Sequence, residues 1–183
     1  MEITEKEALV QQQYLTFFLA DEEFAVNIQR VKEIIEYTTI TKVPKVPQWV
    51  RGVINLRGSV VPVVDLAARF ALSERGLTKT TCIVILEIEH GSERTVMGVI
   101  ADAVNQVIEL APNDIEEPPA FGAGVRLDYL LGMGKLAKKF ALILNIDKVL
   151  SPAELLAVST LETAPPMEGA AIEESRQEHP EAT

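Results

Sequence analysis

The sequence predicts a mainly β fold made of two similar small barrels. Apolar runs rich in β-branched residues are short, and residues typical of turns separate them, as in an all-β protein. One part of the chain also repeats another, which predicts two equivalent subdomains. Each repeat contains about five short strands, and closing so small a sheet into a barrel removes its exposed edges.

The first elements are predicted to be a hairpin and a third strand. Residues 14–19 and 24–28 are apolar runs on either side of the polar turn Ala-Asp-Glu-Glu. β-branched residues continue through residues 31–43, which predicts the third strand. Pro44 and Pro47 then mark an irregular connection before the next strand.

A tight hairpin with a charged tip is predicted next. Residues 53–56 and 60–64 are its strands, and Arg57-Gly58 forms the corner, where glycine supplies the backbone freedom that the turn needs. Pro62 cannot donate a hydrogen bond to a neighbouring strand, so it predicts an edge position or a bulge. Arg57 alone would be read as an ordinary surface charge.

The second half of the chain predicts four more strands. They cover residues 81–89, 95–100, 127–131 and 140–146, and three prolines and two glycines predict a loop over residues 111–125.

Two short helices are expected between and after the strands. Asp65 is placed to cap the first, LAARF. Ser151-Pro152-Ala153-Glu154 combines an N-cap hydroxyl, a proline at the first helical position and a carboxylate at the capping-box position. A C-terminal helix should therefore run to about Leu161.

The expected folded domain covers residues 12–159, and its two subdomains divide roughly into residues 20–80 and 81–147. Residues 1–11 are polar and acidic, without the apolar segment of a secretion signal. Residues 160–183 carry too little apolar surface to offset the entropy lost on ordering. Both ends are therefore expected to be disordered, the second as an acidic tail.

The internal repeat is visible at two offsets. Residues 63–65 align with residues 145–147 at an offset of 82. Residues 26–36 align with residues 99–109 at an offset of 73, and the matched pairs are Val26 with Val99, Val31 with Val104, Ile34 with Val107, Ile35 with Ile108, and Glu36 with Glu109.

Composition restricts the possible functions. A net charge of −10 and an isoelectric point near 4.7 argue against nucleic acid and anionic membranes as partners. No apolar run approaches the length of a membrane span, and the single cysteine, Cys82, fits a reducing compartment. We therefore expect a soluble cytoplasmic protein.

Catalytic and metal-binding motifs are weak. His90 lies in a predicted turn and His179 in the tail, and neither has a nucleophile nearby in the sequence. No HxxxH, CxxC or EF-hand spacing is present. The sequence therefore predicts a binding protein that is not an enzyme and needs no cofactor or metal.

Several motifs resemble the CheW family of bacterial chemotaxis coupling proteins. They are YLTFFLADEEFAVNI, VKEII, GVINLRG with VPVVDL, GVIADAVNQVI and LILNIDKVL, which occur in this order from about Gln12 to Leu156. The resemblance implies two SH3-like five-stranded β-barrel subdomains related by a pseudo-twofold. It also implies an adaptor between the cytoplasmic helical tips of chemoreceptors and the CheA histidine kinase, whose own CheW-like regulatory domain would be bound.

The resemblance also implies site residues. The receptor would lie in an apolar groove between the barrels, at Leu15, Ile28, Val31, Ile34 and Val104. Glu33, Gly52 and Arg57 match positions that affect coupling or assembly.

From the residues alone, part of this groove is ambiguous. The spacing of Ile28, Val31 and Ile34 would alternate faces in a regular strand but share one side in an irregular one. Such a stripe could cover the core or bind a partner helix.

Two alternatives remain. The chain could couple a pili-based or other chemosensory pathway, or, more distantly, be a small barrel that binds oligonucleotides or sugars. The second would favour a basic, aromatic-rich face, whereas this chain is acidic with 5% aromatic residues. As an adaptor, the chain would be a monomer when free and would join receptor arrays, without inserting into the membrane itself.

Overall fold

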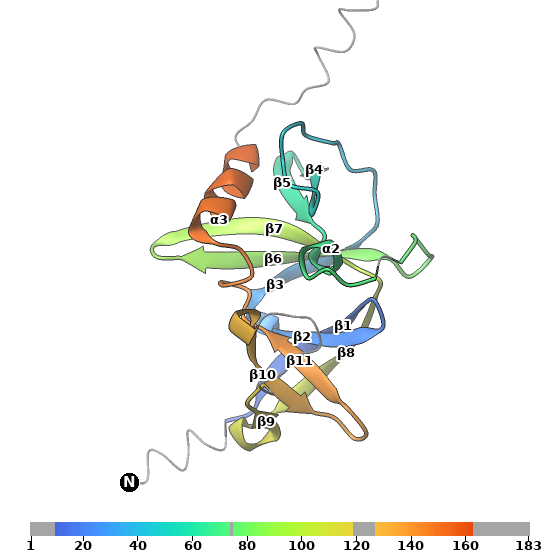
Figure 1. Ribbon diagram of the computed structural model, residues 1–183, viewed down its shortest axis with the longest axis vertical. Coiled ribbons are helices and arrows are strands. Elements are labelled where there is room, and N and C mark those ends of the chain that lie inside the picture. The colour runs from blue at the N-terminus through green and yellow to red at the C-terminus, as the bar shows by residue number, and fades with distance from the viewer. Residues whose placement is uncertain (1–9, 74, 119–126, 163–183) are drawn as a thin grey trace, which may run out of the picture.

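The chain folds into two β-sheets, which form the upper and lower halves of the molecule in Figure 1. This computed structural model describes residues 10–73, 75–118 and 127–162. The strands are β1 (Gln12–Leu19), β2 (Glu22–Asn27), β3 (Val31–Glu36), β4 (Val50–Leu56), β5 (Ser59–Val64), β6 (Cys82–His90), β7 (Glu93–Ala101), β8 (Ala103–Leu110), β9 (Ile115–Glu116), β10 (Leu130–Lys135) and β11 (Phe140–Leu144). The helices are α2 (Leu66–Arg69) and α3 (Pro152–Ser159), and the 3-10 turns are η1 (Ile28–Arg30), η2 (Pro112–Asp114), η3 (Leu127–Tyr129) and η4 (Thr160–Glu162).

The two sheets repeat one strand order. In the upper sheet, β3-β6-β7 is antiparallel, β7 pairs with β5 in parallel, and β5 forms a hairpin with β4. In the lower sheet, β8-β1-β2 is antiparallel, β2 pairs with β11 in parallel, and β11 forms a hairpin with β10. The short β9 extends this sheet at β10. The mainly β fold with two equivalent SH3-like subdomains is therefore confirmed.

The chain is not divided between the subdomains near residue 80 as expected. The first hairpin, β1-β2, lies in the lower sheet between β8 and β11, far from it in the sequence. Figure 1 shows these N-terminal strands among strands of the second half of the chain. The lower sheet thus takes β1, β2 and the strands from β8 to β11, and the upper sheet takes the strands from β3 to β7. The apolar strands β1 and β2 gain two long-range partners in this arrangement, which local sequence patterns do not specify.

The strand registers confirm the repeat at an offset of 73. In the parallel pairs, Ala25 lies opposite Ile143 and Gly98 lies opposite Val63. Ala25 and Gly98 are therefore equivalent, and they are 73 residues apart. Val26 and Val99 follow as the next equivalent pair.

The second offset of the repeat, which relates the β4-β5 hairpin to the β10-β11 hairpin, is 80 residues, so the expected value of 82 is wrong. A register shift follows Val50 in the β4-β5 hairpin and follows Leu130 in the β10-β11 hairpin. A matching hydrogen bond closes the open end of each hairpin. The amide of Asp65 donates to the carbonyl of Trp49, and the amide of Asn145 donates to the carbonyl of Tyr129, both at 2.7 Å. Asp65 is thus equivalent to Asn145.

Most of the apolar core lies between the two sheets. Its largest cluster joins Phe17 and Phe24 of the lower sheet to Val84 and Leu86 of the upper sheet. Each sheet also has one smaller cluster on its outer face. One shared core therefore fixes the two subdomains against each other, which is expected of sheets too small to bury their apolar faces alone.

The C-terminal helix begins as predicted, but the folded chain continues past residue 159, where the folded domain was expected to end. Ser151 Oγ accepts a hydrogen bond from the amide of Glu154, and a Glu154 side-chain oxygen accepts one from the amide of Ser151. Leu155, Val158 and Leu161 are buried in the shared core. The expected start of disorder at residue 160 is therefore wrong, because Leu161 of η4 packs inside; residues 1–9 and 163–183 lie outside the described residues.

One other expectation needs correction: the third strand ends at Glu36, before the predicted limit of residue 43. Pro62 agrees with its expectation. Strand β5 lies between β4 and β7, but its parallel pairing with β7 starts only at Val63, so Pro62 has no hydrogen bond to make on that side. A register shift, typical of a bulge, also interrupts the β4-β5 hairpin between Val50 and Gly52.

Candidate functional site

The edge strand β3 carries two apolar residues on its core-facing side. Val31 lies opposite Leu86 and Ile34 lies opposite Val84, and both partners belong to the shared core. The register shifts between Val31 and Glu33, because a bulge inserts an extra residue there. The bulge places Val31 and Ile34 on one side despite their spacing of three, which answers the question that the sequence left open.

The edge strand β8 repeats this arrangement in the lower sheet. Val104 lies opposite Phe17, and Val107 lies opposite Leu15, with a register shift between the two pairs. Phe17 and Leu15 belong to the shared core, so Val104 and Val107 share the core-facing side of β8. The alignment of Val31 with Val104 therefore corresponds to a structural equivalence.

Together these residues form an apolar rim beside the shared core. Ile28, Val31 and Val104 are partly buried against the core. Ile34 remains 43% exposed and Val107 remains 50% exposed. We call these five residues, Ile28, Val31, Ile34, Val104 and Val107, the rim. Val107 was absent from the predicted site, although its match to Ile34 at the offset of 73 was the signal that could have found it.

Leu15 does not belong to the accessible surface, contrary to expectation. Its side chain is 2% exposed and lies in the shared core. β1 is flanked by β2 on one side and β8 on the other, so a residue in its middle that faces the upper sheet is covered. Leu15 is therefore removed from the expected groove, whereas Ile28, Val31, Ile34 and Val104 keep part of their surface accessible.

Arg57 lies at the tip of the β4-β5 hairpin, as predicted. Arg57 and Gly58 have φ angles of 51° and 87°, which are typical of the type I′ turns that join two strands tightly. The Asn55 side chain supports the turn by accepting a hydrogen bond from the amide of Gly58. Arg57 Nη2 lies 2.8 Å from Glu33 Oε2, although the Arg57 side chain is 79% exposed. The structure thus brings these two predicted coupling residues together.

The Glu33–Arg57 pair lines a shallow hollow on the outer face of the upper sheet. Val61 and Ile85 line the same hollow, as does Lys32. Lys32 forms an ion pair with Glu87 at 3.1 Å. The hydrogen bond from Lys32 lowers the pKa of the Glu87 carboxyl, and other nearby cations add to this effect. Glu33 and Arg57 therefore belong to a charged surface on the opposite face of β3 from the rim.

Gly52 is required by the fold. It has a φ of 139°, and a Cβ atom at this position would overlap the backbone carbonyl oxygen of Thr41. Thr41 and Val53 exchange two backbone hydrogen bonds at 2.9 Å beside it. Gly132, its equivalent at the offset of 80, is also crowded, though less closely, by Ile115 and Glu116. A side chain at Gly52 would therefore disturb the hairpin that presents Arg57.

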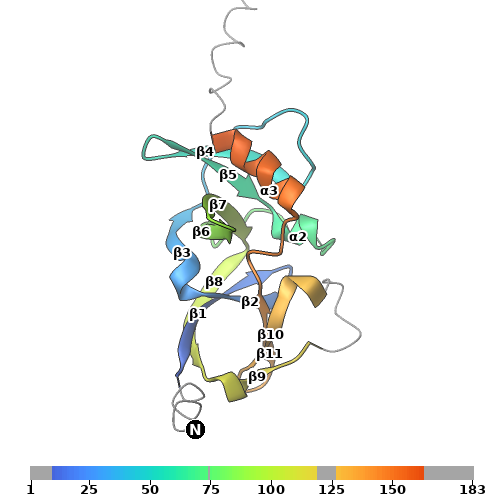
Figure 2. The ribbon, with the colours of Figure 1, turned by 90° about the vertical axis from the view of Figure 1, so that its left-hand side faces the viewer.

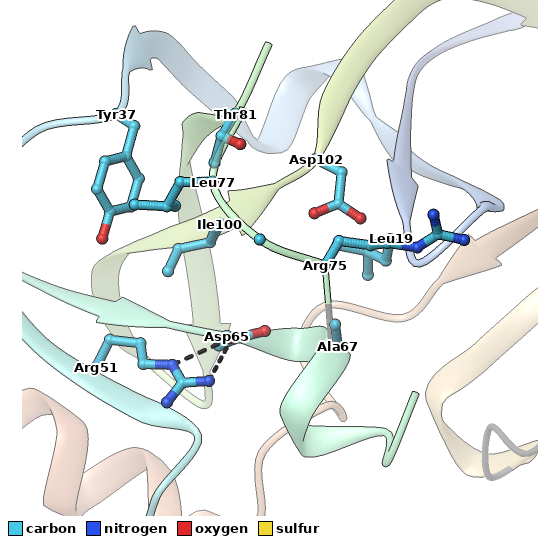
Figure 3. Close-up of a pocket in the computed structure, with 11 residues that line it drawn as sticks. Leu19, Tyr37, Arg51, Asp65, Ala67, Arg75, Leu77, Thr81, Ile100 and Asp102 are labelled. Carbon is cyan, nitrogen blue, oxygen red and sulfur yellow. Dashed lines mark hydrogen bonds and ion pairs between the residues drawn. The ribbon is translucent and has the colours of Figure 1, made fainter. Parts of the chain in front are cut away.

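A cavity of about 230 Å³ lies elsewhere, beside α2 (Figure 3). Arg51 donates to Asp65 Oδ2 through two nitrogens, at 3.1 and 2.8 Å. Asp102 Oδ2 accepts a hydrogen bond from the amide of Ala20 at 2.7 Å, and Arg75 pairs with Asp21. The charged side chains that line this cavity, Arg51, Asp65, Arg75 and Asp102, thus each have a partner already, and none of the predicted site residues lines it.

The described part of the chain shows neither a metal site nor a membrane-spanning helix. Within residues 10–73, 75–118 and 127–162, no three His, Cys, Asp or Glu side chains come together in a way that could hold a metal ion. Over the same residues, no helix has the length and apolar character needed to cross a membrane.

The chain matches the family model of the CheW-like domain over residues 13–154, which include the rim and the Arg57 hairpin. It is similar to the chemotaxis protein CheW of Klebsiella aerogenes, with 32% identity over 152 residues that cover 83% of this chain and 89% of the relative. It is also similar to the chemotaxis protein CheW of Bacillus subtilis, with 34% identity over 132 residues, or 72% and 80% of the two chains.

A solved structure agrees with these matches. The crystal structure of the scaffolding protein TtCheW from Thermoanaerobacter tengcongensis superposes with a TM-score of 0.71 at 32% identity. The superposition covers 79% of this chain and 91% of that one, so it includes both sheets. The sequence match and the fold match extend over the same two subdomains, and the chain therefore belongs to the CheW-like domain family.

Proposed function

We propose that the chain is a chemotaxis adaptor that couples the cytoplasmic helical tips of chemoreceptors to a CheA-type histidine kinase. The observation that carries this proposal is the CheW-like family match over residues 13–154, which spans both subdomains. The protein would act in the cytoplasm by binding, without catalysis and without a cofactor, and would reach the membrane only through the receptors.

The rim supports the receptor part of the proposal. Ile34 and Val107 are large apolar side chains that stay about half exposed on equivalent edge strands. Because each belongs to a different subdomain, a single apolar partner could contact both halves of the molecule. An amphipathic helix suits such a surface, since its apolar residues repeat along one face.

The hollow at the Arg57 hairpin supports a second, separate contact. Arg57 is highly exposed, yet its backbone is fixed by a tight turn and its guanidinium is oriented by Glu33. A charge held in this way loses little conformational freedom on binding a partner. We assign the Glu33–Arg57 surface to coupling, and the rim to the receptor helix.

The proposed mechanism is a shift of conformational populations. An adaptor that contacts receptor and kinase at once changes kinase output if it binds one receptor state more tightly than the other. Many weak contacts of this kind would hold an array together through multivalency.

A reconstituted binding assay tests the proposal. Purified protein, a CheA-type kinase and a receptor cytoplasmic fragment are combined, and wild type is compared with Val31→Glu and Arg57→Glu. We expect Val31→Glu to weaken receptor binding, because a charge would enter an apolar contact at a cost of about 1–3 kcal/mol. Arg57→Glu should reduce coupling, since the new carboxylate would face Glu33.

Gln106→Glu is the matched control for Val31→Glu. It adds the same charge to an edge strand, but Gln106 lies opposite Thr16, on the face of β8 away from the rim. If wild type binds neither receptor nor kinase, the proposed function is wrong. If Val31→Glu lowers thermal stability while receptor affinity per folded molecule is unchanged, the rim is only part of the core.

A further inference from the structure

A row of aromatic side chains crosses the molecule from the rim side to α2. Phe17, which lies opposite Val104 of the rim, stacks on Phe24 with ring centroids 6.4 Å apart. Phe24 stacks on Phe70 at 5.9 Å, and Phe70 stacks on Tyr129 at 5.3 Å. Figure 2 shows the elements near the two ends of this row, with β1 and the rim strand β3 on the left and α2 on the right.

Arg69 of α2 lies at the far end of this row, between two equivalent aromatic rings. Its guanidinium carbon lies 5.2 Å from the ring centroid of Trp49 and 5.5 Å from that of Tyr129. Trp49 precedes β4 of the upper sheet, and Tyr129 precedes β10 of the lower sheet, at the offset of 80. One cation therefore contacts the same position of both subdomains.

A third contact ties Arg69 to the C-terminal helix. Arg69 Nη2 donates to Glu154 Oε1 at 3.0 Å, and Glu154 belongs to α3, which follows the last strand of the lower sheet. Arg69 Nε is buried and has no hydrogen-bond partner among the described residues. The guanidinium is thus held largely by ring faces and one carboxylate, an arrangement that depends on its planar shape.

The position of Arg69 bears on the rim because the rim is divided between subdomains. Val31 and Ile34 belong to the upper sheet, and Val104 and Val107 belong to the lower sheet. The distance between these two halves of the rim depends on how the sheets are oriented. A contact that fixes the sheets on the α2 side also fixes the rim on the other side, since packed cores transmit small shifts.

We propose that Arg69 is a positioning residue that sets the orientation of the two subdomains and thereby shapes the receptor-binding rim. This inference rests on the proposed function for its binding partner. The orientation itself can be measured without any partner.

The test combines a distance measurement with a binding measurement in the full chain. Spin labels are attached at Ser92→Cys in the β6-β7 turn and Lys138→Cys in the β10-β11 turn, both exposed, with Cys82→Ala removing the native thiol. We expect Arg69→Met to shift or broaden the distance between the labels. It should also weaken binding of a receptor cytoplasmic fragment, per folded molecule, by about fivefold or more.

Three further variants make the result specific to Arg69. Arg94→Met is the matched control, because both of its carboxylate partners, Glu87 and Glu89, lie on its own sheet. Arg69→Lys keeps the charge and loses the planar stacking, so it should restore both readouts only in part. Trp49→Leu removes one of the two rings and gives a second test if Arg69→Met does not fold.

The outcomes separate this inference from the proposed function. If the label distance in Arg69→Met and Trp49→Leu matches that of wild type, Arg69 does not set the orientation and the inference is wrong, whatever happens to stability. If the distance changes but receptor affinity does not, its link to the rim is wrong. If wild type itself fails to bind the receptor fragment, the proposed function fails, and the distance measurement still decides whether Arg69 orients the subdomains.

Discussion

Removing the two most exposed rim side chains should weaken receptor binding far more than it weakens the fold. Ile34 and Val107 are 43% and 50% exposed, so about half of each side chain remains for a partner to cover. Fully burying an aliphatic side chain of this size contributes about 1.5–3 kcal/mol, so covering the exposed half contributes about 1 kcal/mol at each position. Ile34→Ala with Val107→Ala should therefore cost about 2 kcal/mol of binding free energy, or roughly thirtyfold in affinity.

The assay is a titration of a labelled receptor cytoplasmic fragment, followed by fluorescence anisotropy, with urea unfolding of the same preparations. Gln106→Ala is the matched control, since it truncates an exposed side chain on the other face of β8. Unchanged affinity of the double variant, together with a large loss of stability, would show that both side chains serve the core, and the assignment of the rim would be withdrawn.

Three other predictions concern the fold that holds the site. Glu23 is buried; burial raises its pKa, but the ion pair with Lys139 at 2.8 Å and the hydrogen bond from Asn105 outweigh this and leave the pKa below its usual 4.5. Its stabilising effect is thus complete above pH 4.5 and is lost as the pH falls through the lower folded-state pKa, so unfolding in urea should show a smaller acid-induced loss of stability in Glu23→Gln. Gly52→Ala should cost about 3 kcal/mol or more in thermal unfolding, because of the overlap with Thr41, whereas Gly58→Ala, with nothing within 4 Å, should cost only about 1 kcal/mol; equal losses would contradict this. Ser151→Ala should lower stability by about 1 kcal/mol through loss of the α3 cap, and an unchanged melting temperature would argue against the cap.

Local chemistry made much of the fold predictable. The Arg57-Gly58 corner followed from glycine between two β-branched runs, and the Ser151 cap followed from residues within one helical turn. The repeat at the offset of 73 was also readable, because equivalent strands kept apolar residues at equivalent positions. The offset of the second hairpin was missed by two residues, since short apolar runs can be aligned in more than one register.

The site was predicted less well than the fold. Val31, Ile34 and Val104 are at the rim, but Leu15 is core, and Val107 was left out of the predicted site. Whether an apolar residue of a strand is covered depends on which strands lie beside it. In this chain the decisive neighbours, β1 and β8, are about ninety residues apart in the sequence.

The sequence by itself determined most of the strands, their turns, the helix cap and the existence of two equivalent units, because each depends on residues that are close together in the chain. It missed β8 and β9, and the strand expected at residues 127–131 lies instead at Leu130–Lys135. Only the tertiary structure decided that the first hairpin joins the lower sheet, that two bulges turn the rim residues to one side, and that Arg69 lies between Trp49 and Tyr129. These features arise from contacts between distant segments, whose free energy is set by how well the sheets pack together, and no short stretch of sequence carries that information.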